Sequence, residues 1–272
     1  MTDTATEMPI ATTDPDEVRR FLLAFTAHVR AATAGMPDPG LLQMARVHPT
    51  TKNSYVPTRY RLDDVERMIT DAITDSDGGH NVYIEGRTVR AGIRKGRGTV
   101  QDTVAVFALV ADDDADKGKA AKALPITPTL LVQSSPGNTH PWFLLAKAVS
   151  PEEGIALGAA LKAALGGDPN TGTITQPYRV SGTVNYPTAT KLKRGRVAVP
   201  TKLLAEARAY TSEELLAAFP PPPPKEETQQ TGEHASGPPP ELPRLRPARV
   251  PVSDGRGSAP RHDVRTRLRA DP

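Results

Sequence analysis

The chain has 272 residues, of which 38% are hydrophobic and 4% aromatic, and its formal net charge is +3. It contains no cysteine, which excludes disulfides, cysteine-ligated zinc, iron–sulfur clusters and thiol nucleophiles, and which fits a reducing cytoplasm. No apolar run approaches the roughly 20 residues that span a bilayer, and the N-terminus lacks the features of a signal peptide, so the sequence predicts a cytoplasmic protein without a membrane partner.

Proline divides the chain into a folded body and a tail. The 28 prolines crowd toward the C-terminus, where FPPPPPKEE opens a segment of Pro, Gly, Gln and Arg that cannot bury a core. We therefore expect a disordered N-terminus over residues 1–13, a folded domain over 14–219 with its core in 62–200, and a disordered tail over 220–272.

The first half of the folded domain is expected to hold two helices and two strands. Asp14 and Pro15 open a helix whose apolar residues recur at helical spacing as far as Val29. Residues 34–61 contain four prolines and are expected to be irregular, and a second helix is expected over 62–74. Strands follow over 81–89 and 103–111, separated by the basic, glycine-rich turn AGIRKGRG.

The second half continues with strands and two more helices. A strand over 129–135, the turn PGNTH and a strand over 141–145 form an expected hairpin. Ser150, Pro151 and Glu153 open a helix that ends at the glycines 166 and 167. Residues 176–185 are expected to be extended or to form a turn, residues 196–199 to form an edge strand, and Thr211 to open a last helix that reaches Phe219. The sequence thus predicts mixed α and β structure.

The apolar run TVAVFALVADDDAD ends abruptly in acids. Because side chains alternate along a strand, Asp112 and Asp114 are predicted to share one face while Asp113 points away. Two carboxylates at the edge of a sheet suit a divalent cation. The alternative is a solvated turn that opens a helix over 117–124, which Asp116 would cap.

The hairpin LLVQSSPGNTHPWFLL carries Ser134, Ser135, Gly137 and His140 at its turn. In a functional interpretation the glycine lets the backbone approach a phosphate, a serine hydroxyl donates to it, and His140 adds a donor or a positive charge. In the alternative interpretation this is an ordinary hairpin in which the glycine permits the turn and the histidine is exposed.

Two later segments add an acid and several cations. Asp168 follows the glycines of LGGDPN, where simple turn chemistry is the alternative. The stretch QPYRVSGTVNYPTATKLKRGR supplies side chains that can pair with phosphates, unless it is only a solvated basic loop. These side chains are Arg179, Asn185, Lys191, Lys193, Arg194 and Arg196. Further basic clusters lie at 87–97 and 244–269, where contact with a polyanion is the alternative to solvated loops.

In this order, the segments resemble the archaeo-eukaryotic primase superfamily, and within it the RepB-like primases of plasmids, phages and other mobile elements. The resemblance covers residues 63–196: VADDD is similar to the superfamily's two acids separated by one residue, SSPGNTH to its Ser/His motif, GGD to its third acid, and QPYRVSGTVNYP to its closing stretch. Many relatives carry an acid shortly before that closing stretch, where this chain has Thr175 and Gln176. The resemblance implies an α+β fold, an RRM-like antiparallel or mixed sheet with flanking helices.

The resemblance also implies template-directed nucleotidyl transfer with two Mg²⁺ or Mn²⁺ ions. Asp112, Asp114 and Asp168 would bind the metal and act in catalysis with His140. Ser134, Ser135, Gly137, His140 and Arg179 would bind the nucleotide, and Asn185, Lys191, Lys193, Arg194 and Arg196 the nucleic acid. The expected partners are a single-stranded DNA template and ribo- or deoxynucleoside triphosphates. No GxxxxGK[ST] loop is present in the sequence, so unwinding would need a separate helicase.

Two other classes of function stay open at this point. A non-catalytic replication initiator or single-strand-binding protein would keep the same fold and use it only to bind nucleic acid, and binding would then survive replacement of Asp112 and Asp114. A metal-dependent nuclease would also use clustered carboxylates, and it would degrade the template without nucleoside triphosphates.

Overall fold

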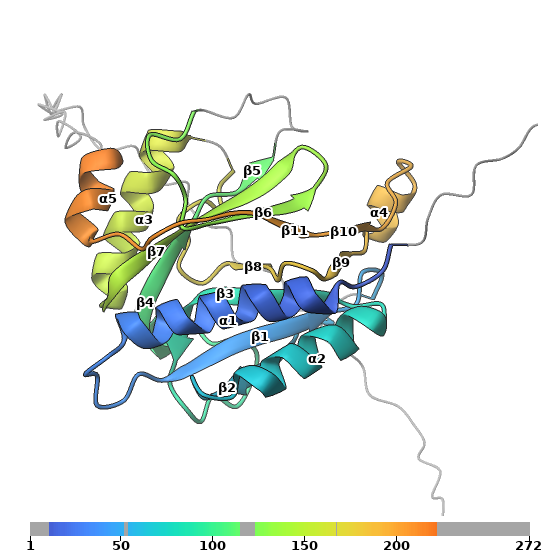
Figure 1. Cartoon of the computed structure of the whole chain (residues 1–272), viewed down its shortest axis with the longest axis horizontal. Coiled ribbons are helices and arrows are strands. Elements are labelled where there is room, and N and C mark those ends of the chain that lie inside the picture. The colour runs from blue at the N-terminus through green and yellow to red at the C-terminus, as the bar shows by residue number, and fades with distance from the viewer. Residues whose placement is uncertain (1–10, 52–53, 115–122, 167, 222–272) are drawn as a thin grey trace, which may run out of the picture. The chain divides into compact units, whose positions relative to one another are not determined.

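The computed structural model of the chain (Figure 1) describes residues 11–51, 54–114, 123–166 and 168–221. Several predictions fall outside these residues: the disordered N-terminus up to residue 10, the tail from residue 222, most of the helix over 117–124, and Asp116 as its cap. Among the described residues, no helix is both long and apolar enough to cross a membrane.

The described residues contain one large antiparallel sheet of nine strands. Seven strands follow the order β11-β6-β7-β4-β3-β1-β2, while β5 pairs with β7 and β8 pairs with β3. The strands of this sheet are β1 (Leu41–Val47), β2 (Val56–Tyr60), β3 (Asn81–Val89), β4 (Thr103–Val110), β5 (Asp113–Asp114), β6 (Leu130–Ser135), β7 (Asn138–Val149), β8 (Pro177–Arg179) and β11 (Lys202–Glu206). A separate two-stranded pair is formed by β9 (Val184–Asn185) and β10 (Val199–Pro200).

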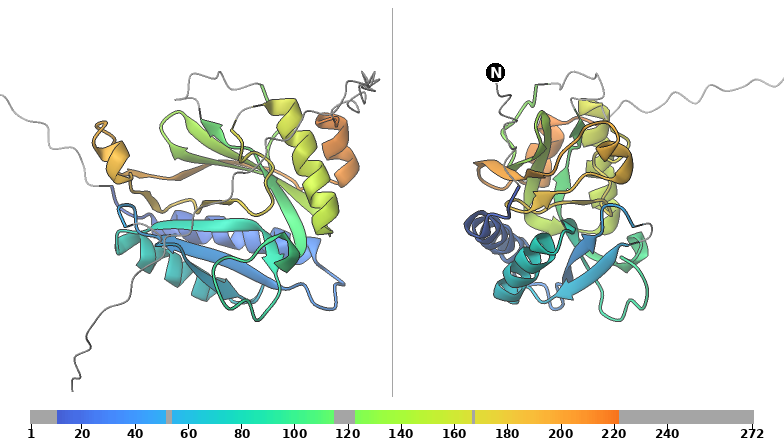
Figure 2. Two further views of the ribbon diagram at one scale, coloured as in Figure 1. Left: turned by 180° about the vertical axis from the view of Figure 1, so that it is seen from behind. Right: turned by 90° about the vertical axis from the view of Figure 1, so that its right-hand side faces the viewer.

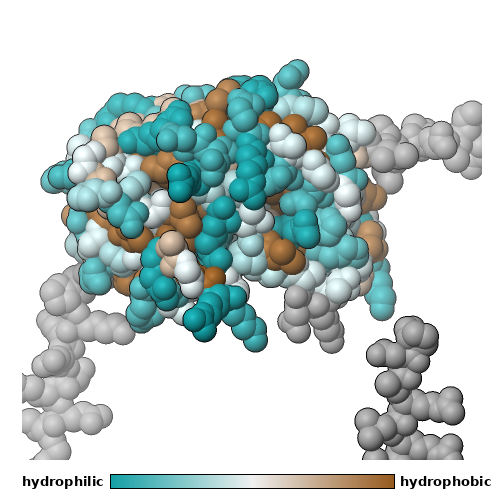
Figure 3. Space-filling view, turned by 90° about the horizontal axis from the view of Figure 1, so that it is seen from below, coloured by the Kyte–Doolittle hydropathy of each residue, from teal (hydrophilic) through white to brown (hydrophobic). Residues whose placement is uncertain are grey.

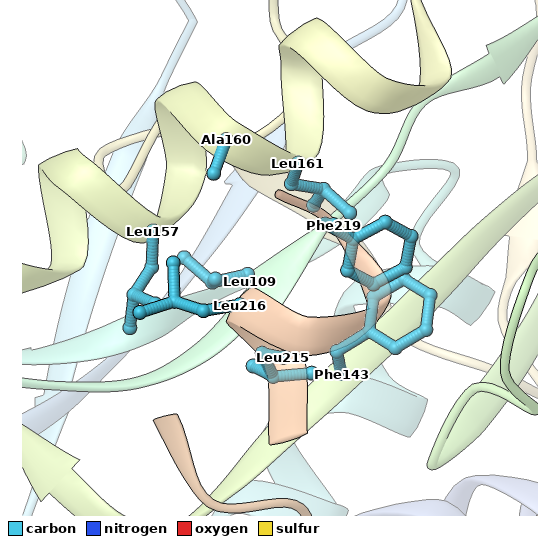
Figure 4. A pocket seen from close by; sticks show the side chains of 8 residues that line it. All are labelled: Leu109, Phe143, Leu157, Ala160, Leu161, Leu215, Leu216 and Phe219. Carbon is cyan, nitrogen blue, oxygen red and sulfur yellow. The ribbon is translucent and has the colours of Figure 1, made fainter. Parts of the chain in front are cut away.

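Helices pack against the sheet in two pairs, and the two helices of each pair lie side by side (Figures 1 and 2). The helices α1 (Pro15–Ala32) and α2 (Val65–Asp77) enclose the larger apolar core with β1, β3 and β7. The helices α3 (Pro151–Leu165) and α5 (Ser212–Ala218) enclose a second core with β4 and β7, in which Leu109 and Phe143 meet Leu161 and Phe219 (Figure 4). The antiparallel sheet with flanking helices confirms the predicted α+β fold.

The helix starts follow local sequence signals. The side chain of Asp14 accepts a hydrogen bond from the amide of Glu17, and Pro15 stands in the first turn of α1. Ser150 caps α3 in the same way, and Thr211 with Glu214 forms a capping box at the start of α5. These three helix starts agree with the sequence prediction because they depend on neighbouring residues alone.

The prediction of irregular structure over residues 34–61 was wrong. This segment contains β1 and β2, and β1 pairs with β2 on one side and β3 on the other. Pro57 is compatible with a strand here because β2 lies at the edge of the sheet, where an amide donor is not required. The second helix begins and ends three residues later than predicted, at Val65 and Asp77.

Three further differences concern the second half of the chain. The predicted turn PGNTH is shorter than expected, because β7 already begins at Asn138 and places His140 within a strand. The edge strand expected over 196–199 begins at Val199 instead and pairs with β9. A short helix, α4 (Ala189–Leu192), lies in the basic run where no helix was predicted.

The sheet divides next to β3. Residues Arg87 to Val89 of β3 pair with β4, whereas Tyr83 to Glu85 pair with β8. Gly86 lies between these two sets, and a Cβ atom there would come within 2.8 Å of the carbonyl oxygen of Ala108. A glycine therefore lets β4 approach β3 closely at the point where β8 is inserted between them.

Another glycine fixes the segment between β8 and β9. Gly182 has a φ of +83°, and a Cβ atom there would lie 2.5 Å from the amide nitrogen of Val18. Its carbonyl oxygen accepts a hydrogen bond of 2.8 Å from the amide of Asp14, and the hydroxyl of Ser181 donates to Glu17. The start of α1 therefore anchors β8, which carries Arg179.

Candidate active site at the end of β4

Asp112 and Asp168 come from separate parts of the chain and lie in one place. Asp112 follows β4, and Asp168 begins the loop after α3. The hydroxyl of Thr171 accepts a hydrogen bond of 3.1 Å from the amide of Asp112, while the amide of Thr171 donates to the carbonyl oxygen of Asp168 at 3.0 Å. The loop that carries Asp168 is thus bonded directly to the end of β4.

Two glycines hold this loop in position. A Cβ atom at Gly158 of α3 would lie only 2.0 Å from the carbonyl oxygen of Gly172, so the helix and the loop are in backbone contact. Gly172 has a φ of +71° and its amide donates to the carbonyl oxygen of Val110 at 2.9 Å. The position of Asp168 therefore depends on a contact between segments far apart in sequence.

Tyr178 links the end of β4 to the loop that carries Asp168. Its hydroxyl is within hydrogen-bonding distance of the carbonyl oxygens of Val110, at 3.3 Å, and Asn170, at 3.1 Å. Burial, and then the negative charges of Asp112 and Asp168, raise the pKa of this hydroxyl. Tyr178 therefore stays protonated at any physiological pH.

His140 completes the group from β7. Its Nε2 is 3.7 Å from a carboxylate oxygen of Asp112, and its ring stands edge-on to that of Tyr178 with centroids 5.2 Å apart. The side chain is buried, and burial, together with the positive charge of Arg179, lowers the pKa of His140 to about 3. The imidazole is therefore neutral at neutral pH, which leaves it as a hydrogen-bond donor rather than a cation. Among the described residues, its Nδ1 has no hydrogen-bond partner.

Arg179 reaches the site from β8. One of its terminal nitrogens donates to the side-chain oxygen of Asn81 at 2.6 Å, and its guanidinium lies over the ring of Tyr83, 4.9 Å from the centroid. Burial lowers the pKa of Arg179, but arginine starts so far above neutrality that it stays charged. A planar cation is thus held rigidly beside His140.

The structure describes Asp113 and Asp114, the next two acids after β4, to different extents. The carboxylate of Asp113 accepts a hydrogen bond of 3.4 Å from the hydroxyl of Thr139, the residue before His140. Asp113 thus bonds to Thr139, whereas Asp112 lies beside His140; that Asp112 and Asp114 share one face stays a prediction. The backbone of Asp114 pairs with Asn138, but its side chain lies outside the part of the chain that the structure describes. Within the described part, no group of three acids, histidines or cysteines could hold a metal ion, so the ligand set with Asp114 stays a prediction.

The serines of the hairpin bond within its turn. Asn138 donates from its side-chain nitrogen to the hydroxyl oxygen of Ser135 at 3.0 Å, and Ser134 is 3.4 Å from the carbonyl oxygen of Asn138. Gly137 has a φ of +79°, which favours glycine in the tight turn after Pro136. This geometry explains the turn; the role of these residues toward a phosphate stays a prediction.

A pocket of about 250 Å³ lies beside the hairpin turn. It is lined by Ser135, Pro136, Asn185, Pro187, Lys191, Gly195, Arg196, Val197 and Val199. Asn185 bonds β9 to the hairpin, because its side-chain amide donates to the carbonyl oxygen of Ser134 at 2.6 Å. The structure therefore brings a predicted nucleotide-binding serine together with three of the predicted nucleic-acid-binding residues. Lys193 and Arg194 are exposed and do not line this pocket.

Three contributors to the site carried little or no sequence signal. Tyr178 was detectable only as an aromatic residue next to Arg179, and Asn81 only as the first residue of a strand. Thr171 stands in a turn-like stretch that no pattern distinguishes. All three act by bridging segments, which a single sequence does not reveal.

Comparison with known proteins bears on the whole domain. A family model described as the RepB DNA-primase N-terminal domain matches residues 49–219. Among solved structures, the AEP domain of the cyanophage S-2L primase-polymerase is similar with a TM-score of 0.50 and 14% identity, covering 74% of this chain and 98% of that one. A structure of primase RepB′ follows with a TM-score of 0.47 and 17% identity, covering 73% of this chain and 61% of that one. No curated protein matches significantly.

Proposed function

The chain belongs to the RepB DNA-primase family, and we propose that it is an active DNA primase that joins ribo- or deoxynucleotides on a single-stranded DNA template during replication of a plasmid, phage or other mobile element. The observation that carries this proposal is the contact between Asp112 and His140 at the end of β4, to which the loop carrying Asp168 is bonded through Thr171. A domain that only bound DNA would not need carboxylates at this place, because they repel phosphates.

The donor set fits Mg²⁺ or Mn²⁺. Carboxylate oxygens are the ligands that these ions prefer, and Asp112 and Asp168 both act on the Tyr178 hydroxyl. We propose that these two carboxylates, with Asp114 as predicted from strand alternation, hold two metal ions. When bound, such ions lower the pKa of the attacking 3′-hydroxyl and neutralise charge on the leaving pyrophosphate.

The remaining residues would bind and orient the incoming nucleotide. Arg179 offers a planar cation whose position is already fixed by Asn81 and Tyr83, so little freedom is lost when it binds a phosphate. The neutral ring of His140 would donate one hydrogen bond to a phosphate oxygen. Lys191 and Arg196, at the pocket beside the hairpin turn, would neutralise further negative charge.

Single-stranded DNA, nucleoside triphosphates and a separate helicase are the partners that this proposal requires. The template strand would follow the basic residues of α4 and the turn after it, including Lys193 and Arg194. These contacts would be made to the phosphate backbone, so they would carry no sequence information themselves and would weaken steeply with added salt.

Replacement of two of the proposed metal-binding acids, with a neighbouring acid as control, tests the proposal. Asp112→Ala combined with Asp168→Ala is expected to abolish the synthesis of new oligomers from labelled nucleotides on a single-stranded template with Mg²⁺ or Mn²⁺. Asp113→Ala is the matched control: it removes a carboxylate next to Asp112 that faces the other side of the strand, and synthesis is expected to stay within about threefold of the wild type.

Three results would contradict the proposal. Synthesis that survives in the Asp112/Asp168 variant would exclude these carboxylates from catalysis. A wild-type protein that binds the template but makes no product with either metal would favour a non-catalytic initiator. Degradation of the template in the absence of nucleotides would favour a nuclease.

A further inference from the structure

A basic loop far from the carboxylates is unexplained by the proposed chemistry. Residues 90–99 connect β3 to the 3₁₀ turn before β4 and include Arg90, Arg94, Lys95 and Arg97. Arg90 pairs with Asp102 at 2.7 Å. Arg94 and Lys95 are exposed, and neither has an ion-pair partner among the described residues. The loop therefore presents two cations to solvent.

Three side chains hold this loop by its carbonyl oxygens: Arg87 and Gln43 are buried, and Arg59 is partly exposed. Arg87, whose side chain is 0% exposed, donates to the carbonyl oxygens of Arg97 at 3.1 Å and Thr99 at 2.6 Å. Arg59 donates to the carbonyl oxygen of Gly96 at 2.7 Å, and Gln43 to that of Arg97 at 3.0 Å. Burying a guanidinium costs several kcal/mol unless it is paired. A loop that was merely solvated would not require such an anchor.

The loop and the candidate active site are joined by one face of β3. Asn81, Tyr83, Glu85 and Arg87 alternate with the apolar residues that face α1 and α2, so they share the opposite face. The first two contact Arg179, and the last two belong to the anchor of the loop. Six residues of a strand span about 20 Å, so a single strand of several nucleotides is needed to reach from one end of this face to the other.

Aromatic rings accompany the cations along this face. The hydroxyl of Tyr55 donates to Glu85 at 3.1 Å, and the guanidinium of Arg97 lies over its ring, 6.0 Å from the centroid. Tyr83 lies under Arg179 at the other end. Both tyrosines are partly exposed. Cations with interleaved aromatic rings are the combination that binds single-stranded nucleic acid, because bases stack on the rings while cations pair with phosphates.

We propose that residues 92–98, with Tyr55 and Tyr83, form a second contact for single-stranded DNA, about 20 Å along β3 from Arg179. In this proposal Arg94 and Lys95 bind phosphates of the template, and its bases stack on the partly exposed rings of Tyr55 and Tyr83. The direction of the strand toward the carboxylates rests on the proposed primase function; the binding itself does not.

Two double variants, each of which removes two positive charges, test the proposal. Arg94→Ala with Lys95→Ala changes the loop, and Arg20→Ala with Arg30→Ala removes the same charge from the exposed side of α1, across the sheet. Binding is measured by fluorescence anisotropy with labelled oligonucleotides of about 2 and about 12 nucleotides, at several salt concentrations, without metal or nucleotides.

The loop variant is expected to bind the longer oligonucleotide on the order of tenfold more weakly near 0.1 M salt, and its salt slope is expected to fall by about 1.4, the value for two lost phosphate contacts on a single strand. The shorter oligonucleotide, which cannot reach both contacts, should bind all proteins alike.

Equal affinities and slopes for the loop variant and the α1 variant would overturn the proposal. So would an equal loss for both oligonucleotide lengths, since that result indicates a general charge effect. The assay needs no synthesis, so it can separate the two proposals. If the wild type made no primers while the loop variant bound the longer oligonucleotide more weakly than the wild type, the second contact would be supported and the primase function excluded.

Discussion

Two groups of buried polar side chains lie in this molecule, and they differ in how their charges are paired. In the group on β3, Glu85 and Arg87 pair at 2.7 Å, and Gln43 and Tyr55 donate to the same carboxylate. In the group after β4, two carboxylates act together on Tyr178, while His140 is neutral and has an unpartnered buried nitrogen among the described residues. The first group pairs its two charges directly, which suits a structural role; the second brings carboxylates, a buried neutral histidine and the cation Arg179 near one another, which suits a site that binds charged ligands.

The outer surface of the molecule over α2 and β2 differs from both buried groups. The underside of the molecule in Figure 1, where α2 and β2 lie, is largely hydrophilic, with apolar side chains in small groups (Figure 3). The helices have already buried the large apolar residues of β1 and β3. Because these apolar residues are already buried, we look for function among charged and polar side chains, and the two buried polar groups are the features to test.

The largest expected effect is the loss of the balancing cation on β3. Arg87→Met keeps most of the side-chain volume but leaves Glu85 buried without its partner, so the free energy of unfolding should fall by about 3–5 kcal/mol. Urea denaturation followed by circular dichroism measures this change.

The double variant Glu85→Gln with Arg87→Met serves as its control. Removing both charges should recover a large part of the loss, because no uncompensated charge is then left buried. If the single variant were as stable as the wild type, the group on β3 would not have the structural role assigned to it here.

The next effect concerns the contact that positions Asp168. Gly158→Ala places a methyl group against the carbonyl oxygen of Gly172, so the loop must move, at a cost of about 1–3 kcal/mol. Primer synthesis should fall by far more than this loss of stability explains, because the carboxylate moves with the loop.

Ala159→Gly is the stability-matched control. Ala159 is an exposed residue of the same helix, and glycine there costs roughly 1 kcal/mol without touching the loop. Equal synthesis by the two variants, measured at a temperature where both are folded, would show that the position of Asp168 is unimportant.

The structural features that the sequence predicted correctly are those whose causes lie between neighbouring residues. The strand over residues 81–89 and the helix caps at Asp14, Ser150 and Thr211 were predicted, because alternation and capping involve neighbours. Strand alternation also separated Asp113 from Asp112. The strand β1 was missed because its mixed sequence, LLQMARV, lies among prolines, and only its pairing with β2 and β3 identifies it.

The site shows the same limit. The proximity of Asp168 to Asp112 depends on the backbone contact between Gly158 and Gly172, and the burial of His140 depends on the strand register that begins β7 at Asn138. The Gly182 turn, by contrast, could be anticipated as a turn but not as the anchor of α1. Tertiary contacts of this kind leave no pattern in one sequence.

A smaller effect is expected from Tyr178→Phe. The phenol oxygen lies near two carbonyl oxygens, so its loss should cost about 0.5–1.5 kcal/mol of stability. The pKa of Tyr178 is raised, so the hydroxyl stays protonated up to and beyond pH 10, and ionisation of this group should not shape the pH profile of synthesis. Profiles of wild type and variant between pH 7 and 10 should therefore be parallel. A fall in activity with rising pH that the variant lacked would mean that the phenol ionises in the working enzyme.

The smallest effect on stability is expected in the group after β4, and it separates this group from the one on β3. Asp112→Asn keeps the size of the side chain, and without metal it should change the free energy of unfolding by less than about 1 kcal/mol, because Asp112 is partly exposed, unlike the fully buried ion pair on β3. Adding Mn²⁺ should raise the melting temperature of the wild type, because a ligand that binds only the folded state stabilises it, and should raise that of the variant less. Arg87→Met, whose group is already balanced, should respond to Mn²⁺ as the wild type does. If instead Asp112→Asn lost stability as Arg87→Met does, the carboxylates after β4 would be part of the protein's structural framework, and the difference in charge pairing between the two groups would no longer distinguish a site from a scaffold.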